Sequence, residues 1–197
     1  MKTLFLDLGG VLLTNGWDRH ARERAVKQFS LDESEVNSRH SLTFDTLEIG
    51  KISLDEYLNR VVFYKKQPFT KKEFLSFMYA QSQPYPDMIK LCKRLKKQHD
   101  LHLVAVSNEA RELTDYRIKT FKLDTFIDSF VVSCFVKLRK PDSEIFTLAL
   151  DISNSHPKEV VYIEDRPLFA AVAKKLGIHA IYHKDFKSTA AQLHKIF

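Results

Sequence analysis

The residues of this sequence that are best suited to chemistry stand at the ends of short apolar runs. The set is Asp7, Ser107-Asn108, Lys140 and Glu164-Asp165. All of them except Lys140 directly follow such a run. If the runs are strands of a parallel sheet, the residues that follow them meet at the carboxyl edge, where open α/β sheets bind their ligands. The sequence therefore predicts one polar site built from distant segments.

The carboxylates of this set point to metal chemistry. A carboxylate at the tip of a buried strand is costly unless something pairs with it. If Asp7 and Asp165 converge, they can share a hard cation such as Mg²⁺, which prefers oxygen ligands and keeps several waters. Lys140 would then neutralise the excess negative charge.

The same set also suits the binding of an anion. The Ser107 hydroxyl can donate a hydrogen bond to an oxyanion, and the turn at Leu8-Gly9-Gly10 can aim its backbone amides at phosphate oxygens. We therefore expect Gly9 and Gly10 to contribute to a phosphate site.

Each of these residues also has a plain structural explanation. Asp7 can form a turn before the glycines, Ser107-Asn108 can cap a helix, and Glu164-Asp165 can begin the helix at Pro167. Lys140 alone can be a surface lysine. Their shared position at strand ends favours the chemical interpretation.

Five apolar runs that alternate with helical patterns predict the elements that position these residues. The expected strands are Thr3 to Leu6, Leu101 to Val106, Phe130 to Ser133, Val160 to Ile163 and Ala180 to Tyr182. Helical spacing covers Asp87 to Gln98, Ala110 to Phe121, Asp142 to Leu150 and Leu168 to Leu176. This alternation is typical of an α/β fold with a five-stranded parallel sheet covered on both faces.

A long helical excursion separates the first strand from the second. It comprises helices over Asp18 to Phe29, Ser53 to Phe63 and Thr70 to Ala80, with a polar patch after the first of them. Ser53 with Glu56, and Thr70 with Glu73, have the spacing of capping boxes. We expect residues 15–84 to form a helical cap inserted into a core made of residues 1–14 and 85–197.

Composition limits the classes of protein to consider. The chain has 197 residues, 44% of them hydrophobic, and a net charge of +6, which favours anionic partners. The basic residues form no stripe interleaved with aromatic readers, so we do not expect nucleic-acid binding. Two cysteines without a CxxC spacing favour a reducing compartment, the cytoplasm, and no run suggests a signal peptide or a membrane span.

The order of the motifs resembles the haloacid dehalogenase superfamily of hydrolases. The four signatures read FLDLGGVL at 5–12, VSN at 106–108, RKPDSEIF at 139–146 and VYIED at 161–165. Residues 48–53 and 171–178 are also similar to the family, so the likeness spans nearly the whole chain. Within the helical-cap subfamily, the chain resembles the members that are similar to glucose-1-phosphatases and to the N-terminal domain of epoxide hydrolases.

This resemblance implies a Rossmann-like core with a helical cap and assigns a role to each polar residue. Asp7 would attack phosphorus and form an aspartyl-phosphate that water then hydrolyses. Mg²⁺ would be held by Asp7, the Gly9 carbonyl and Asp165, with Glu164 behind them. The phosphoryl group would be bound by Ser107 and Lys140, with Asn108, Gly9 and Gly10 supporting it.

The chain departs from the family pattern at Gly9. Phosphatases of the family usually carry there a second aspartate that protonates the leaving group, and losing a general acid costs about 10²- to 10⁴-fold in rate. Three explanations stay open: a good leaving group such as an anomeric sugar phosphate, an acid from the cap such as Asp18, or a weakly catalytic phospholigand-binding protein. Lys137, where glycine is common, and Phe169, where a polar residue is common, are smaller departures.

The resemblance predicts a magnesium-dependent phosphatase that acts on a small phosphorylated metabolite, with sugar phosphates as one candidate class. A 2-haloacid dehalogenase also lacks the second aspartate, but it needs no metal, whereas Glu164 beside Asp165 favours a metal site. The sequence does not predict the oligomeric state.

Overall fold

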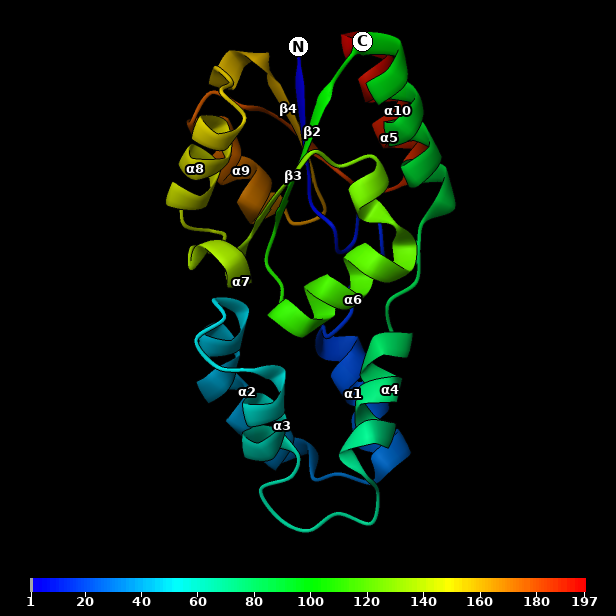
Figure 1. Ribbon diagram of the computed structural model, residues 1–197, viewed down its shortest axis with the longest axis vertical. Helices are drawn as coiled ribbons and strands as arrows, with labels where there is room; N and C mark the ends of the chain where they lie inside the picture. The colour runs from blue at the N-terminus through cyan, green and yellow to red at the C-terminus, as the bar shows by residue number, and fades with distance from the viewer. Residues whose placement is uncertain (1) are drawn as a thin grey trace.

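A single parallel sheet forms the centre of the protein. The computed structural model describes residues 2–197, and its strands are arranged in the order β3-β2-β1-β4-β5 (Figure 1). The strands are β1 (Thr3–Leu6), β2 (His102–Ser107), β3 (Ser129–Val132), β4 (Val160–Glu164) and β5 (His179–Tyr182). All pairings between them are parallel. The predicted α/β fold with a five-stranded parallel sheet is confirmed.

Helices cover both faces of the sheet. They are α5 (Pro86–His99), α6 (Arg111–Phe121), the single turn α7 (Ser133–Val136), α8 (Glu144–Ile152), α9 (Pro167–Lys175) and α10 (Phe186–Ile196), with 3₁₀ turns η1 (Leu123–Thr125) and η2 (Pro157–Glu159). Helices α5 and α10 lie on one side, and α8 and α9 lie on the other (Figure 1). Because β1 alternates its side chains between the faces, Leu4 and Leu6 enter one core and Phe5 enters the other.

Five helices lie between β1 and β2, and the first four of them extend beyond the carboxyl edge of the sheet, away from the chain ends (Figure 1). These cap helices are α1 (Arg19–Phe29), α2 (Glu33–Glu48), α3 (Leu54–Val61) and α4 (Lys71–Ala80). They enclose an apolar cluster in which Phe74 is fully buried against an edge of Trp17. The division at residues 15 and 84 into cap and core stays a prediction.

Local signals explain where two of the cap helices begin. Ser53 and Thr70 each accept a hydrogen bond from the backbone amide three residues later, and Glu56 and Glu73 return the bond to the cap amide. Both predicted capping boxes are therefore confirmed.

No helix was predicted within the polar patch after α1. It contains α2, the longest helix of the described chain, capped by Asp32, whose side chain accepts from the Glu35 amide. Few of its residues are buried, Val36 and His40 among them, so its apolar periodicity is weak. Packing against α3 stabilises it instead. Helix α10, also unexpected, is held by Leu193 and Ala190 in the core of the sheet.

Among residues 2–197, no helix combines the length and the apolar character that crossing a membrane requires.

Candidate active site

The carboxyl edge of the sheet brings the sequence-predicted residues together. Strands β2 and β4 both pair with β1, so Ser107 and Glu164 end beside Asp7. The Asp7 amide donates to the Ile163 carbonyl at 3.0 Å and continues the ladder by one residue. The Ser107 hydroxyl donates to Asp7 Oδ1 at 2.8 Å, as does the Leu8 amide.

Lys140 stands between two buried carboxylates. Its Nζ lies 3.0 Å from Asp7 Oδ2 and 2.7 Å from Glu164 Oε2, and the lysine is only 1% exposed. Burial alone would lower the pKa of Lys140, but the two carboxylates outweigh it and hold the pKa above its ordinary value. Burial raises the pKa of Asp7 to about 6, although Lys140 opposes this rise.

Tyr162 belongs to this network and was missed from the sequence. Its hydroxyl donates to Glu164 Oε2 and accepts from Lys140 Nζ at 3.0 Å. Tyr162 and Glu164 are two residues apart on β4, so their side chains lie on the same face of the sheet. That spacing is the signal that could have revealed it.

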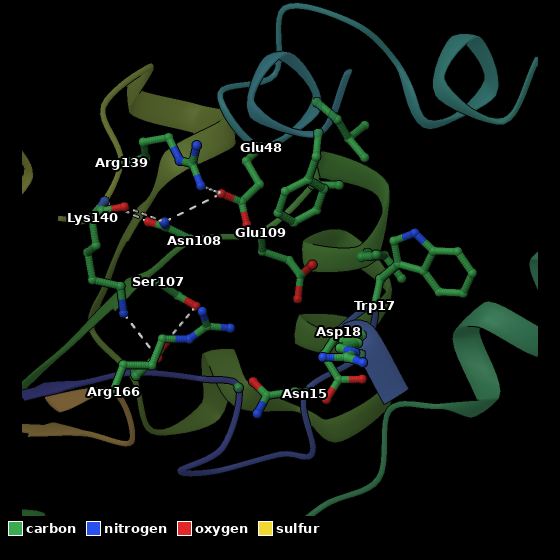
Figure 2. Close-up of a pocket in the computed structure, with 18 of the residues that line it drawn as sticks. Asn15, Trp17, Asp18, Glu48, Ser107, Asn108, Glu109, Arg139, Lys140 and Arg166 are labelled. Atoms are coloured by element: carbon green, nitrogen blue, oxygen red, sulfur yellow. Dashed lines mark hydrogen bonds and ion pairs between the residues drawn. The ribbon is translucent and has the colours of Figure 1, made fainter. Parts of the chain in front are cut away.

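Asn108 holds the segment that carries Lys140. Its Nδ2 donates to the Lys140 carbonyl and its Oδ1 accepts from the Lys140 amide, both at 2.8 Å. This reciprocal pair ties the end of β2 to the lysine loop (Figure 2). A direct contact of Asn108 with a phosphoryl group stays a prediction.

The acidic residues form a cluster that suits a hard metal ion. Carboxylate oxygens of Asp7, Glu164 and Asp165 lie within 4.8 Å of one another. Both oxygens of Glu164 have donors, since its Oε1 accepts from the Arg166 amide at 2.9 Å. Asp165 Oδ1, in contrast, is buried with no hydrogen-bond partner among residues 2–197. An all-oxygen donor set with one unsatisfied oxygen fits Mg²⁺.

The glycine turn is shaped by its neighbours. Gly10 has a φ of +74°, and a Cβ on it would lie 2.1 Å from Asp165 Oδ2. A Cβ on Gly9 would lie 2.6 Å from Asn15 Oδ1, so Asn15 fills the space where the usual second aspartate would begin. The Asn15 amide group in turn donates to Asp165 Oδ2 at 3.3 Å.

Two of the three backbone amides of this turn are already hydrogen-bonded, including that of Gly10, which was expected to contribute to a phosphate site. The Gly10 amide donates to the Leu13 carbonyl at 2.7 Å and the Leu8 amide to Asp7, so both are used within the turn. Among the described residues, only the Gly9 amide of these three has no hydrogen bond. An anion would have to displace the Gly10 bond, so the phosphate roles of Gly9 and Gly10 stay predictions.

A cavity of about 290 Å³ lies between the sheet edge and the cap helices. Ser107, Lys140 and Arg166 of the core lie at one end (Figure 2), and Asp7, bonded to Ser107, also lines the cavity. The cap contributes aromatic, basic and acidic side chains: Trp17, Asp18, Arg19, Arg22, His40, Phe44 and Glu48. The Asp18 carboxylate caps α1 by accepting from the Ala21 amide at 2.8 Å. Both Asp18 and Trp17 therefore line the cavity and also have a structural role.

Two glutamates of the cavity were not predicted. Glu109, just after Asn108, forms an ion pair with the buried Arg117 at 2.5 Å. Glu48, at the end of α2, pairs with Arg139 at 2.6 Å. Burial raises the pKa of both, to about 7 for Glu48, although the arginines oppose the rise. Neither follows a strand directly, so the strand-end pattern missed them.

The two smaller departures also have places here. Lys137 adopts the left-handed conformation at a φ of 63°, which explains why glycine suits the position, and its Nζ donates to the Gly50 carbonyl at 2.6 Å. The Phe169 ring lies 5.2 Å from Lys140 Nζ and lines the cavity.

Three comparisons with known proteins bear on the family. The chain is 29% identical over 193 residues to a phosphorylated carbohydrates phosphatase of Thermotoga maritima, covering 92% of this chain and 84% of that protein. It is 29% identical to (S)-2-haloacid dehalogenase 4A of Burkholderia cepacia, over 56% of this chain and 47% of that one. A HAD family enzyme of Bacteroides thetaiotaomicron, solved with magnesium and inorganic phosphate, has a TM-score of 0.80 at 23% identity, covering 94% and 97% of the two chains.

The sequence profile of the haloacid dehalogenase-like hydrolases matches residues 1–188. Together with the parallel sheet and the order of the strand-end residues along the chain, this match shows that the protein is a hydrolase of the haloacid dehalogenase-like family.

Proposed function

We propose that this hydrolase is a magnesium-dependent phosphatase that acts on a small phosphorylated metabolite through an aspartyl-phosphate at Asp7. The observation that carries the proposal is the buried Asp7 carboxylate, bonded by Ser107 and Lys140 beside an unsatisfied oxygen of Asp165. The phosphatase among its relatives, which acts on phosphorylated carbohydrates, supports the same reaction.

Mg²⁺ would be held by Asp7, Asp165 and the Gly9 carbonyl, with Glu164 behind them. When bound, it supplies positive charge to the phosphate oxygens and orients them. Glu164 is suited to the supporting role because Lys140, Tyr162 and the Arg166 amide already occupy its oxygens. The unsatisfied Asp165 oxygen supports this assignment.

Covalent chemistry falls to Asp7. Its carboxylate oxygen attacks phosphorus, the ester P–O bond breaks, and the leaving oxygen takes the bonding electrons and a proton. Water then attacks the phosphorus of the aspartyl-phosphate and returns the carboxylate and inorganic phosphate. Ser107 and Lys140 are placed to bind phosphoryl oxygens once the substrate separates them from Asp7.

The proton for the leaving group must come from a residue other than Gly9. Asn15, which fills that space, has no acidic proton to give. A substrate with a good leaving group would need the least help, and Asp18 stays a candidate acid at the cavity wall. Weak catalysis with retained ligand binding is the alternative outcome.

Dehalogenation is the second candidate because the dehalogenase relative shares 29% identity over part of the chain. The cluster of three carboxylates favours the metal-dependent reaction instead. Halide release from a 2-haloacid that persists in the presence of a chelator would support dehalogenation.

The experiment measures phosphate release from a panel of phosphorylated metabolites with Mg²⁺ and with a chelator. We expect release with Mg²⁺, loss with the chelator and loss in Asp7→Asn. Asp115→Asn, on the exposed face of α6, is the matched control and should retain full activity. Absence of release from every substrate would contradict the phosphatase proposal.

A further inference from the structure

The basic residues that line the cavity fall into two groups. Four of them are paired with carboxylates: Arg19, Arg117, Arg139 and Lys140. Among residues 2–197, Arg22 and Arg166 form no ion pair with a carboxylate. Arg166 lies on the core side, directly after Asp165, whereas Arg22 projects from α1 of the cap. The cap end of the cavity thus holds one cation whose charge no protein group balances directly.

One hydrogen bond holds the Arg22 side chain in place, but its guanidinium keeps a buried nitrogen that has no partner in the described chain. One of its terminal nitrogens donates to the Trp17 carbonyl at 3.3 Å, while its Nε is buried with no partner in the described chain. Burial lowers the pKa of Arg22, but a guanidinium remains protonated in proteins. Asp18 and Glu23 lie close enough to favour the charge, yet Asp18 caps α1 and Glu23 pairs with Arg19. A half-buried cation left in this way can be stabilised further by an anion from outside the chain.

Three ring side chains near Arg22 are linked by hydrogen bonds and carry no negative charge. The Trp17 indole donates to the Tyr57 hydroxyl at 2.9 Å, and that hydroxyl lies 2.7 Å from His40 Nδ1. Burial first, and then the charge of Arg22, lowers the pKa of His40 to about 4, so the imidazole is neutral near pH 7. His40 lines the same cavity as an uncharged imidazole.

The two ends of the cavity therefore differ in what they bind. The core end has Asp7, Ser107 and Lys140 for the reacting phosphoryl group, on the proposed function above. The cap end has Arg22 and His40, with Phe44 and Trp17 as apolar walls. A neutral sugar ring would bring hydroxyls to this end but no charge to balance Arg22.

We propose that the substrate carries a second anionic group, which Arg22 binds at the cap end while the scissile phosphate lies at Asp7. This inference rests on the proposed phosphatase function and narrows its substrate to small phosphorylated acids or bisphosphates. A cavity of about 290 Å³ suits a metabolite of that size. The planar guanidinium matches the two oxygens of a carboxylate or phosphate.

Matched substrates test the proposal. Glucose 6-phosphate and 6-phosphogluconate carry the same phosphate ester, but the second is an open-chain acid with a carboxylate at the far end, and fructose 1,6-bisphosphate supplies a phosphate there. We expect kcat/KM to be about ten- to a hundredfold higher for one of the two doubly anionic substrates than for glucose 6-phosphate. The anion that gives this preference identifies whether a carboxylate or a phosphate is bound.

Variants of α1 locate the effect. Arg22→Gln should remove that preference by raising KM for the doubly anionic substrate, while kcat/KM for glucose 6-phosphate changes less than about twofold. Arg24→Gln removes an exposed arginine of the same helix, bonded to Gln81, and should change neither. Equal rates on all three substrates, or an equal loss on all three in Arg22→Gln, would overturn the proposal.

Failure of the phosphatase proposal would be recognised separately, as no phosphate release from any substrate, including p-nitrophenyl phosphate. Ligand binding measured by calorimetry then tests whether Arg22 forms an anion site. Tighter binding of 6-phosphogluconate or fructose 1,6-bisphosphate than of glucose 6-phosphate, lost in Arg22→Gln, supports the anion site. Equal affinities refute it.

Discussion

Lys140 balances the charge of buried carboxylates, in addition to any role in binding a substrate. One ammonium group serves both Asp7 and Glu164, and all three side chains are buried. Removal of the cation would leave two carboxylates close together in a low-dielectric setting, where each raises the cost of ionising the other. The lysine is therefore part of the fold as well as of the site.

Lys140→Met should lower the free energy of unfolding by about 3–5 kcal/mol at pH 7 without Mg²⁺, because it leaves buried charge unpaired. Urea denaturation measures this loss. Adding Asp7→Asn to the same chain removes one of the stranded charges and should restore part of the stability. A loss below about 1 kcal/mol in the single variant would show that solvent already reaches these groups.

Gly10→Ala should weaken Mg²⁺ binding. The new Cβ would lie 2.1 Å from Asp165 Oδ2, so the carboxylate must move. Gly177→Ala is the matched control, because its φ of +88° imposes similar backbone strain while the nearest atom is 3.5 Å away. Titration of thermal stability with Mg²⁺ should show weaker affinity in the first variant alone. The same affinity in both would mean that Asp165 does not bind the metal.

At the scale of elements, helix α6 secures both linkers that join the cap to the sheet. The Arg117 guanidinium donates to the Thr14 carbonyl at 2.9 Å and to the Ser82 hydroxyl at 3.0 Å, and it pairs with Glu109. Gly16 passes so close that a Cβ there would lie 2.2 Å from the guanidinium. The buried Arg117 side chain thus connects the cavity wall with both linkers between the cap and the sheet.

Arg117→Met should cost about 3–5 kcal/mol of unfolding free energy, because the buried Glu109 loses its partner and two polar groups lose their donor. Chemical denaturation at pH 7 provides the measurement. The double variant Arg117→Met with Glu109→Gln should recover part of the loss, since no charge is then stranded. A double variant as unstable as the single one would show that the linker contacts, and not the ion pair, dominate.

In the whole molecule, the cap helices contact the core on two sides of the cavity. The linkers provide one side. On the other, Arg139 pairs with Asp45 and Glu48, and the Ser133 hydroxyl donates to the Glu48 carbonyl at 2.7 Å. The close approach of Gly50 to this region, where a Cβ would lie 2.5 Å from the Cys134 carbonyl, requires glycine. Polar contacts therefore join the cap to the core on both sides of the cavity.

Stability should depend on pH through His40. Its pKa falls from an unfolded value of 6.5 to about 4 in the folded protein, because of burial and the charge of Arg22. The unfolded chain therefore binds more protons between these values, so stability decreases as the pH falls through that window, by up to about 3 kcal/mol. Glu48 and Asp7, with raised pKa values, act in the opposite direction.

The difference between wild type and His40→Gln isolates this contribution. We expect the stability advantage of the wild type at pH 7 to shrink as the pH approaches 5, measured by urea denaturation at each pH. A difference that does not change with pH would show that His40 titrates normally.

The sequence by itself determined the parallel sheet and the meeting of Asp7, Ser107 and Asp165. The reason is local: an apolar run forms a strand, and neighbouring parallel strands end at the same edge. Spacing likewise determined the capping boxes at Ser53 and Thr70.

Only the tertiary structure decided how the cap helices meet this edge. The contacts of Arg117 with Thr14 and Ser82, and the exposure of Arg22 to the cavity, join segments whose separation along the chain carries no signal. Helix α2 was not predicted from the sequence, because its own apolar pattern is weak and packing against α3 stabilises it. The position where a strand ends is set by the local sequence. Which face of a cap helix contacts the core depends on the packing of the complete chain.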